Sequence, residues 1–350
     1  MKKFKLFSIL FIIVSVCLCL ASCEASVSSF KFNYWNEDAE SFKSLIEYVE
    51  DVTDKKSENF IPVEDRIAVF DMDGTLCGEL FPTYIEYLLC AYRCLEDPTY
   101  EATDEMIQVA NTIVEGAKTN TFPSDMAMQH AITQAKAFSG LTIEEFDTYV
   151  KEFLKQNAAG FENLTYANSF YKPMIEVLAY LQFHDFTTYI VSGSDRFICR
   201  ACACEVCNIP ENQVIGMDVE LKSSNQGDAN TLDYQFKTGD TVIRTENVLI
   251  KNLKMNKVVQ ISQEIGKQPV LSFGNSSGDK SMHLFTITNN KYRAQAYMLI
   301  ADDEDRDYGN EAKVASLAAD WEANGFIVIS MKNDFKTIYG YDIVKTSLDE

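Results

Sequence analysis

The stretch Phe70-Asp71-Met72-Asp73-Gly74-Thr75 decides the fold of this chain. It follows Ile67-Ala68-Val69, an apolar and β-favouring run that predicts a short buried strand, which Gly74 ends. Asp71 and Asp73 are two residues apart, so both carboxylates leave the strand end on the same side. Because converging carboxylates repel each other, the loop needs a cation or a shared proton. The alternative is an acidic turn that only closes a strand.

Four stretches, taken in sequence order, resemble one known family. Phe70–Leu76 is similar to the first motif of the haloacid dehalogenase superfamily of phosphohydrolases. Ile190–Ser194 resembles the second motif, a strand ending in Ser or Thr, and Lys257 resembles the third, a lysine near a helix start. Ser272–Asp279 resembles the fourth motif, an acidic loop after a strand. Each motif alone is weak, but their order and spacing together resemble the phosphoserine phosphatase-like branch.

This resemblance implies a Mg2+-dependent phosphomonoester hydrolase that forms an aspartyl-phosphate and acts on a small phosphorylated metabolite. Asp71 would attack the phosphorus, and Asp73 would protonate the leaving oxygen and later activate water. Ser192 and Gly193 would bind the phosphoryl group, while Lys257 would offset charge on that group and on Asp71. The acid at position 73 argues against a dehalogenase, because dehalogenases lack one there.

Two positions depart from the family pattern. The implied Mg2+ ligands are the Asp71 carboxylate, the Asp73 backbone carbonyl, Asn275 and Asp279. The family usually places two acids at the last two positions, whereas the amide oxygen of Asn275 can ligate a metal without adding charge. Glu79 lies one residue from the usual spacing of a cap glutamate that receives a substrate amine. We therefore include Glu79 among the predicted substrate-binding residues.

Alternating helix and strand patterns predict an α/β fold, with a doubly wound, Rossmann-like parallel sheet and a helical insertion after the first strand. The resemblance implies that this insertion is a helical cap domain. In the cap, Thr142 and Glu145 resemble a capping box at a helix start. Residues Tyr234–Lys237 and Val242–Ile250 alternate on either side of Gly239-Asp240 and predict a β-hairpin. The predicted cap helices span 84–95, 104–118, 125–138 and 143–156.

The predicted domain boundaries follow from these patterns. Residues 1–22 are read as a signal peptide, and residues 23–62 as a tether and an N-terminal helix. The α/β core comprises 63–76 and 186–350, with a β insertion at about 216–250, and the cap spans 77–185.

The N-terminal segment has the features of an export signal. Lys2, Lys3 and Lys5 precede the largely apolar run Leu6–Leu20, which is shorter than a membrane span. The run ends in Leu20-Ala21-Ser22-Cys23, which resembles the bacterial lipoprotein processing box. The resemblance implies that Cys23 is lipidated and anchors the protein in the cell envelope, on the periplasmic or the outer surface. A plain secretory signal is the alternative, and it also implies export.

Composition limits the partners and the function. A hydrophobic content of 47% indicates a globular protein, and a formal charge of −21 disfavours nucleic acid and attraction to anionic lipid. The predicted partners are a small phosphorylated substrate and a lipid anchor, with protein partners unspecified. The alternative functions are a phosphomutase and a non-catalytic surface lipoprotein that binds a ligand or partner. The intact set of Asp71, Asp73, Ser192 and Lys257 favours an enzyme.

A cluster of cysteines raises the question of a metal site. The spacing of Cys199, Cys202, Cys204 and Cys207 is compatible with zinc or iron–sulfur binding. However, the cluster follows a predicted helix cap at Ser194-Asp195, and on one helix Cys204 lies well round the axis from Cys199. We therefore favour packing as small apolar side chains, or one or two disulfides, over a metal site.

Lipidation of Cys23 is the first testable prediction. We expect mass spectrometry of the mature protein to find Cys23 at the N-terminus with attached acyl chains, because the processing box ends there. A Cys23→Ser variant serves as the control and should stay unlipidated. An unmodified N-terminus at any other residue would contradict the prediction.

Overall fold

The computed structural model describes residues 30–79, 83–119 and 121–348. The described residues from Phe32 onward form one compact unit, which holds the sheet and its helices. Cys23 and the predicted signal peptide lie outside the described residues. Within those described ranges, no helix combines the length and the apolar character needed to cross a bilayer.

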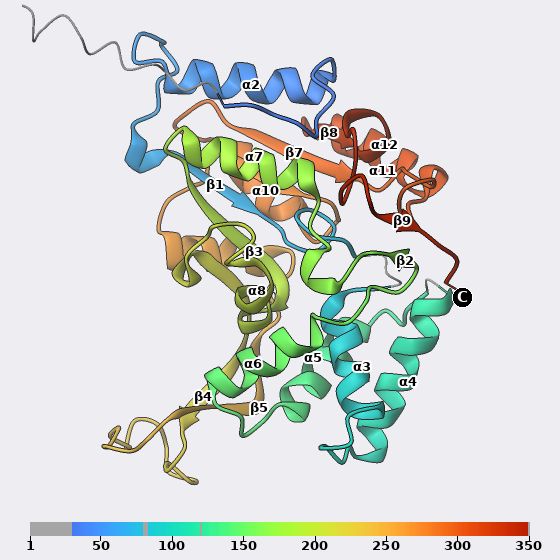
Figure 1. The fold of residues 1–350 in the computed structure, drawn as a ribbon. Coiled ribbons are helices and arrows are strands. Elements are labelled where there is room, and N and C mark those ends of the chain that lie inside the picture. The colour runs from blue at the N-terminus through green and yellow to red at the C-terminus, as the bar shows by residue number, and fades with distance from the viewer. Residues whose placement is uncertain (1–29, 80–82, 120, 349–350) are drawn as a thin grey trace, which may run out of the picture. The chain divides into compact units, whose positions relative to one another are not determined.

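A seven-stranded, mostly parallel sheet forms the centre of the fold. Its strands are β1 (Ile67–Phe70), β3 (Thr187–Asp195), β4 (Val214–Ser223), β5 (Val242–Ile250), β6 (Leu271–Gly274), β7 (Gln295–Ile300) and β8 (Ile327–Ser330). They lie in the order β5-β4-β3-β1-β6-β7-β8, and β5 alone among them runs antiparallel to its neighbour (Figure 1). Two short strands, β2 (Phe161–Glu162) and β9 (Val344–Lys345), pair with each other in a separate sheet.

Helices cover both faces of the sheet. On one face lie α2 (Glu40–Thr53), α7 (Lys172–Phe183) and α8 (Arg196–Ala203). On the other lie α9 (Met255–Gln260), the π-helical turn η4 (Ile261–Ile265), α10 (Lys280–Ile287) and α11 (Glu311–Ala323). Strand order runs outward from β1 through β3 to β4, and outward from β6 through β7 to β8, so the order reverses between β1 and β6. Ligands of such sheets bind at this switch point, outside the carboxyl ends of the strands.

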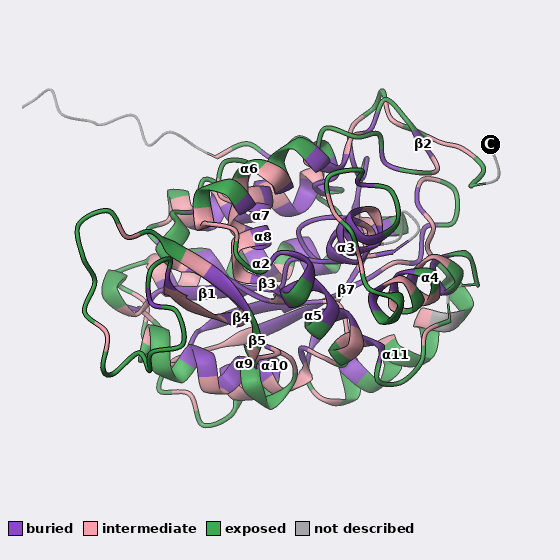
Figure 2. Ribbon diagram, turned by 90° about the horizontal axis from the view of Figure 1, so that it is seen from below, coloured by how far each residue is buried: buried purple, intermediate pink, exposed green. Residues whose placement is uncertain are grey.

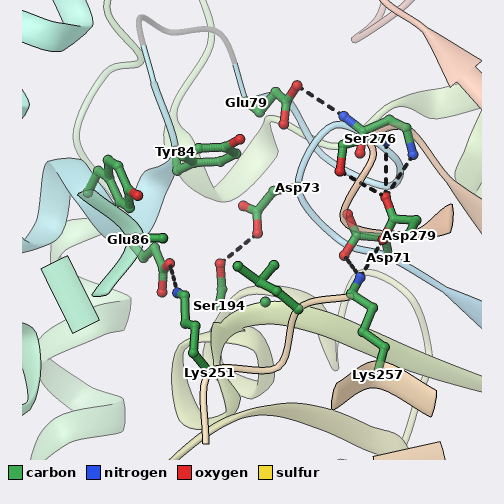
Figure 3. A pocket seen from close by; sticks show the side chains of 15 residues that line it. Asp71, Asp73, Glu79, Tyr84, Glu86, Ser194, Lys251, Lys257, Ser276 and Asp279 are labelled. Atoms are coloured by element: carbon green, nitrogen blue, oxygen red, sulfur yellow. Dashed lines mark hydrogen bonds and ion pairs between the residues drawn. The ribbon is translucent and has the colours of Figure 1, made fainter. Parts of the chain in front are cut away.

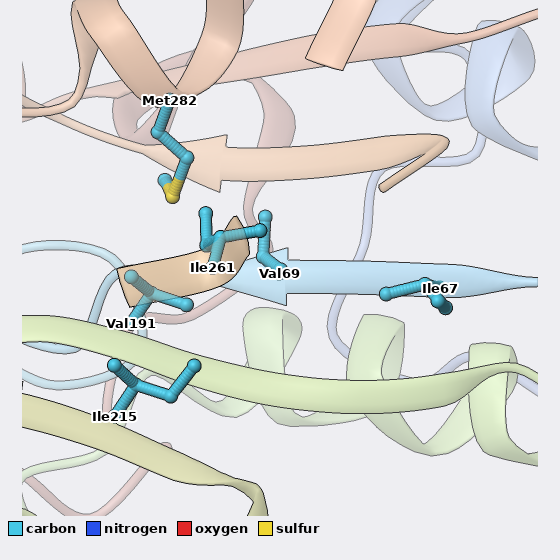
Figure 4. Close-up of a cluster of buried hydrophobic side chains, with 6 residues drawn as sticks. All are labelled: Ile67, Val69, Val191, Ile215, Ile261 and Met282. Atoms are coloured by element: carbon cyan, nitrogen blue, oxygen red, sulfur yellow. The ribbon is translucent and has the colours of Figure 1, made fainter. Parts of the chain in front are cut away.

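Alternation along β1 fills the core on both faces. Ile67 and Val69 point into a buried cluster with Val191, Ile215, Ile261 and Met282 (Figure 4). Phe70 points the other way and stacks on Phe273 with a ring-centroid distance of 4.4 Å. Figure 2 shows the central strands buried, while exposed residues gather on the outer sides of the helices. The four residues of β1 are thus buried on both faces, as expected for the centre of a parallel sheet.

The predicted fold class is confirmed, including the helical insertion after the first strand. The inserted helices are α3 (Ile85–Leu95), α4 (Asp104–Thr119), α5 (Met126–Ala137) and α6 (Ile143–Phe153), and a short helix α12 (Met331–Asp334) follows β8. The capping box at the start of α6 is also confirmed, with Thr142 and Glu145 each bonding the backbone of the other. In Figure 1 the four helices lie side by side, with α5 and α6 nearest to β4 and β5, and α5 packs on both strands through Ala131 and Ala135.

The predicted hairpin around Gly239-Asp240 is wrong. β5 is a strand over the predicted range, but it pairs antiparallel with β4, and Tyr234–Lys237 forms no strand. Two effects explain the difference. The Asp240 carboxylate accepts bonds from the Lys237 backbone and the Tyr234 hydroxyl, which holds the segment in a turn. Phe236 is also exposed, so the segment has no buried face to favour pairing.

The cysteine cluster begins on α8, as its predicted cap indicated. Asp195 accepts a bond from the backbone N–H of Phe197 and so caps the helix. Cys199 and Cys202 are buried on α8, and Cys207 is buried beyond its end. The seven cysteines in the described part of the chain are free thiols. Absence of a metal from the cluster stays a prediction.

A buried ion pair joins the insertion to the core. The guanidinium of Arg244, on β5, donates to both carboxylate oxygens of Asp195 at 3.3 and 2.5 Å, and both side chains are fully buried. The same guanidinium lies 3.9 Å from the ring centroid of Phe146, on α6. Asp195 ends β3, and its backbone N–H donates to Glu86 on α3. One charged pair therefore connects two cap helices, β5 and a central strand.

Removing Arg244 alone should strongly destabilise the fold. We expect Arg244→Met to lower the free energy of unfolding by about 3–5 kcal/mol, because the buried Asp195 carboxylate loses its partner. Urea denaturation followed by circular dichroism measures this loss. The double variant Arg244→Met/Asp195→Asn should recover part of it, because no buried charge is then left alone.

Lys43→Met is the matched control for that experiment. Lys43 pairs with Glu40 on the exposed side of α2, so its loss should change stability by less than about 0.5 kcal/mol. Equal losses in Lys43→Met and Arg244→Met would show that the buried pair does not hold the insertion in place.

Candidate active site

Functional side chains gather where the strand order reverses. Asp71 and Asp73 follow β1, Ser194 stands at the end of β3, Lys257 lies on α9, and Asp279 follows β6. Figure 3 shows these side chains around one cavity, with the cap residues Tyr84 and Glu86 on its opposite wall. The parallel strands therefore bring together residues that are up to about two hundred positions apart.

The loop after β1 is shaped by Gly74. Its φ of +75° is a left-handed conformation that side chains with a Cβ rarely adopt. A Cβ at this position would lie 2.0 Å from Nδ2 of Asn275 and 2.7 Å from Cδ of Glu79. Glycine thus lets the first and fourth motifs approach closely. The backbone N–H of Asp71 also donates to the carbonyl of Phe273, which continues the pairing of β1 with β6 into the loop.

Lys257 bridges two carboxylates. Its ammonium lies 2.6 Å from Oδ1 of Asp71 and 2.6 Å from Oδ1 of Asp279, and its side chain is 1% exposed. The other oxygen of Asp279 accepts bonds from the backbone N–H groups of Asn275 and Ser276. Asp279 is therefore held on both oxygens, and Lys257 orients Asp71 toward the cavity.

Asp73 is held by serine hydroxyls from β3. Its Oδ2 accepts a 2.7 Å bond from Oγ of Ser194 and a longer 3.4 Å bond from Oγ of Ser192. Ser194 lines the cavity together with Gly193, whereas Ser192 is fully buried and its Oγ also accepts a bond from the backbone of Ser194. The sequence analysis placed Ser194 in a helix cap and did not predict its contact with Asp73. The phosphoryl-binding role of Ser192 stays a prediction.

Asn275 and Glu79 meet above Gly74. Nδ2 of Asn275 donates to Oε1 of Glu79 at 3.0 Å, and both residues line the cavity. The amide oxygen of Asn275 is buried and has no hydrogen-bond partner among the described residues. Oδ1 of Asp73 is also buried without such a partner. Two oxygen acceptors at the cavity are therefore left for a ligand to satisfy.

The cavity concentrates negative charge. Burial, with the nearby charge of Asp279, raises the pKa of Asp71. Burial and the charge of Glu86 raise the pKa of Asp73 to about 6. Burial and the charge of Asp73 raise the pKa of Glu79 to about 8. These three carboxyl groups therefore ionise at a higher pH than usual, whereas Lys257 lowers the pKa of Asp279 and Lys251 lowers that of Glu86.

The cap wall carries a second ion pair that the sequence analysis missed. Nζ of Lys251 donates to Oε1 of Glu86 at 3.0 Å, and both side chains are at least nine-tenths buried. The Glu86 carboxylate also accepts a hydrogen bond from the backbone N–H of Asp195. Nε2 of His130 lies 3.1 Å from the backbone carbonyl oxygen of Glu86. In the sequence, Glu86 appears only as an acidic residue in the first turn of a largely apolar helix. A surface glutamate would look the same, so the sequence alone does not predict this ion pair.

The predicted Mg2+ ligands suit an oxygen-seeking cation. Asp71, Asp73, Asn275 and Asp279 all line the cavity, and the amide oxygen of Asn275 is buried without a hydrogen-bond partner among the described residues. The described residues contain no group of three or more His, Cys, Asp or Glu side chains arranged to hold a metal. The predicted set does not require one, because it includes an amide and a backbone carbonyl. Mg2+ commonly uses one or two carboxylates and keeps several waters.

The cavity is small. Its volume is about 110 Å3, well below the about 300–1,000 Å3 of ordinary ligand pockets. Of the predicted site residues, it brings together Asp71, Asp73, Glu79, Gly193, Lys257, Asn275 and Asp279, and it leaves Ser192 behind its wall. The space therefore suits a phosphoryl-sized group rather than a whole metabolite.

The fold recurs in solved structures. One is a conserved functionally unknown protein from Anaerococcus prevotii, with a TM-score of 0.53 and 14% identity, covering 86% of this chain and 94% of that chain. Cytosolic 5'-nucleotidase IIIB bound to cytidine aligns with a TM-score of 0.48 and 12% identity, covering 85% of this chain and 88% of that chain. A phosphoserine phosphohydrolase-like protein from Francisella tularensis aligns with a TM-score of 0.41 and 12% identity, covering 75% and 94%.

These likenesses concern the fold. At 14% identity, the Anaerococcus prevotii structure shows a shared fold and nothing of activity. The two structures named for phosphate chemistry superpose less well, and we draw no argument from them. No protein-family model and no curated protein matches the sequence.

The metal-free protein should lose stability as the pH rises. In EDTA we expect the free energy of unfolding to fall between about pH 4 and about pH 8, because Asp73 and Glu79 titrate near 6 and 8 when folded but near 4 when unfolded. A carboxyl group with a raised pKa binds its proton more tightly in the folded state than in the unfolded state. Its contribution to stability is therefore present at low pH and is lost as the pH rises through the folded-state pKa. Urea denaturation across this range measures the change.

Glu79→Gln tests the assignment of that slope. The amide has no proton to lose, so the variant should show a smaller fall, above all between about pH 6 and about pH 8. Added Mg2+ should restore stability at the upper end of the range, because a ligand of the folded state stabilises it. A slope unchanged by Glu79→Gln would contradict the assignment.

Proposed function

We propose that this protein is a Mg2+-dependent phosphomonoester hydrolase that acts through an aspartyl-phosphate on a small phosphorylated metabolite. The observation that carries the proposal is the position of Lys257. Its ammonium holds Asp71 at 2.6 Å in the same cavity as Asp73, next to Ser194. A nucleophilic carboxylate, a cation beside it and a second carboxyl group are the minimum set for this reaction.

In the first step, an oxygen of Asp71 attacks the phosphorus. The phosphorus–oxygen bond to the leaving alcohol breaks, and Asp73 gives its proton to the departing oxygen. A pKa of about 6 suits Asp73 to this role, because a fraction of the group is protonated near neutral pH. The bond from Ser194 keeps one oxygen of Asp73 in place and leaves Oδ1 for the substrate.

In the second step, water attacks the phosphorus of the aspartyl-phosphate. Asp73, now ionised, takes a proton from that water, and the bond between the phosphorus and Asp71 breaks to release inorganic phosphate. Lys257 stays beside the reacting carboxylate through both steps and offsets the charge that builds on the phosphoryl oxygens.

Asp71, Asp73 through its backbone carbonyl, Asn275 and Asp279 would hold Mg2+. When bound, Mg2+ would supply positive charge against the phosphoryl oxygens. The amide oxygen of Asn275 supports this part of the proposal, because it is buried without a hydrogen-bond partner among the described residues.

Export with a lipid anchor at Cys23 completes the proposal. It rests on the sequence of the processing box alone, since Cys23 lies outside the described residues. An envelope location would place the hydrolase where phosphomonoesters arrive from outside the cytoplasm.

The roles of the two acids predict different failures. With p-nitrophenyl phosphate and Mg2+, Asp71→Asn should form no phosphoenzyme, because the attacking charge is gone. Asp73→Asn should lower turnover by at least about 10²–10⁴-fold, the usual contribution of general acid–base catalysis. It should still form some adduct, since nitrophenolate needs little protonation. Acid-quench mass spectrometry detects the adduct on each variant.

Asp104→Asn, an exposed acid at the start of α4, is the matched control and should keep full activity. EDTA should abolish turnover in the wild type, and Mg2+ should restore it. Full turnover by Asp71→Asn, or an adduct on another residue, would show the mechanism to be wrong. Transfer of the phosphoryl group to a second alcohol instead of water would identify a phosphomutase.

A further inference from the structure

A second cavity adjoins the reaction cavity. It has a volume of about 270 Å3 and lies at the carboxyl end of β7, beside the face of α11 that carries Val314, Leu317 and Trp321. Glu79, Tyr84, Asn275 and Ser276 line both cavities, so the hydrogen bond between Asn275 and Glu79 stands on their common boundary. Gly74 lies beneath that boundary and adds no side chain to it.

The second cavity is mainly aromatic and aliphatic. Its walls include Tyr171, Trp321, Leu299, Val314 and Leu317. Tyr308 also contributes its ring, because its hydroxyl is engaged by the backbone carbonyls of Gly160 and Thr346. These side chains can bury the apolar surface of a ligand, but they offer the ligand few hydrogen-bond donors or acceptors.

Charge is scarce in the second cavity. Of the described residues that line it, only Glu79 carries an ionisable acid or base other than tyrosine, and Glu79 sits at the boundary. A charged group moved into these walls would lose its hydration without gaining a partner. An apolar group would gain from leaving water. The chemistry of the walls therefore selects against ionic occupants.

The reaction cavity is too small to hold the alcohol together with the phosphoryl group. At about 110 Å3, it has room for the phosphoryl group but little for the alcohol attached to it. Asp73 must reach the leaving oxygen, and Glu79, which lines the same cavity as Asp73, also lines the second cavity. The alcohol thus leaves the phosphoryl group near the boundary that the two cavities share.

We propose that the second cavity is the leaving-group site, and that the substrate is a phosphomonoester of a compact apolar or aromatic alcohol. The inference rests on the proposed hydrolase function and specifies its substrate class. The phosphoryl group occupies the cavity of Asp71 and Lys257, and the alcohol lies past Glu79 and Asn275 against Trp321 and Leu317.

The test compares benzyl phosphate with glycerol phosphate, two esters of alcohols with similar intrinsic reactivity. In the wild type with Mg2+, we expect kcat/KM to favour benzyl phosphate by about 10-fold or more. Leu317→Trp fills the second cavity and should lower kcat/KM for benzyl phosphate by about 10-fold, and for glycerol phosphate by clearly less, because glycerol gains little from apolar walls. Val314→Phe, at another wall position, should act in the same direction.

Ala319→Trp is the matched control, because it adds the same ring to an exposed position of α11 outside the cavity. It should leave both substrates unchanged. Calorimetric titration with benzylphosphonate, which cannot be hydrolysed, reports on the cavity independently of turnover. Its affinity should fall in Leu317→Trp and stay constant in Ala319→Trp.

The outcomes separate the two proposals. Hydrolysis that shows no preference for benzyl phosphate, or that Leu317→Trp changes equally for both esters, would overturn the leaving-group site alone. Benzylphosphonate binding that depends on Leu317, without hydrolysis of either ester, would overturn the hydrolase. Absence of both binding and hydrolysis would overturn the two together.

Discussion

The candidate site depends on one buried ammonium group. Lys257 lies between Asp71 and Asp279, two carboxylates that would otherwise face each other across the loops of β1 and β6. Burial of all three charges is tolerable only because they meet within hydrogen-bonding distance and because backbone N–H groups satisfy the far oxygen of Asp279. The arrangement thereby sets both the direction of Asp71 and the spacing of the two loops, and the cavity exists because that spacing is kept.

The cap is attached through the same kind of contact. Arg244 and Asp195 form a second buried pair, and the backbone of Asp195 reaches Glu86 on the wall of the cavity. A displacement of α3 would therefore shift the end of β3, where Ser194 donates a hydrogen bond to Asp73. Cap and core share this series of polar contacts, so the position of Asp73 and the position of the cap helices are not independent.

Much of the fold could be predicted because its signals are local. Buried strands such as Ile67–Phe70 and capped amphipathic helices such as Ile143–Phe153 can be recognised from the pattern of a few consecutive residues. The pairing of strands depends on residues that are distant in the sequence. The sequence analysis therefore paired β5 with Tyr234–Lys237, whereas its partner is β4. In the site, Ser192 and Ser194 lie on the same side of a strand with irregular register, and alternation cannot tell which one meets the cavity. Lys251 belongs to no motif, and only the folded chain brings it to Glu86.

The wide sequence separation of the site residues affects synthesis of the chain. Asp71 is made early, but Lys257, its partner, follows 186 positions later, and Asp279 follows 22 positions after that. β6, which completes the floor of the cavity beside β1, ends at Gly274. A nascent chain that lacks this strand has Asp71 and Asp73 but neither the ammonium group nor the fourth loop. Such a chain cannot assemble the phosphoryl-sized cavity, so the cavity forms only after Asp279 has left the ribosome.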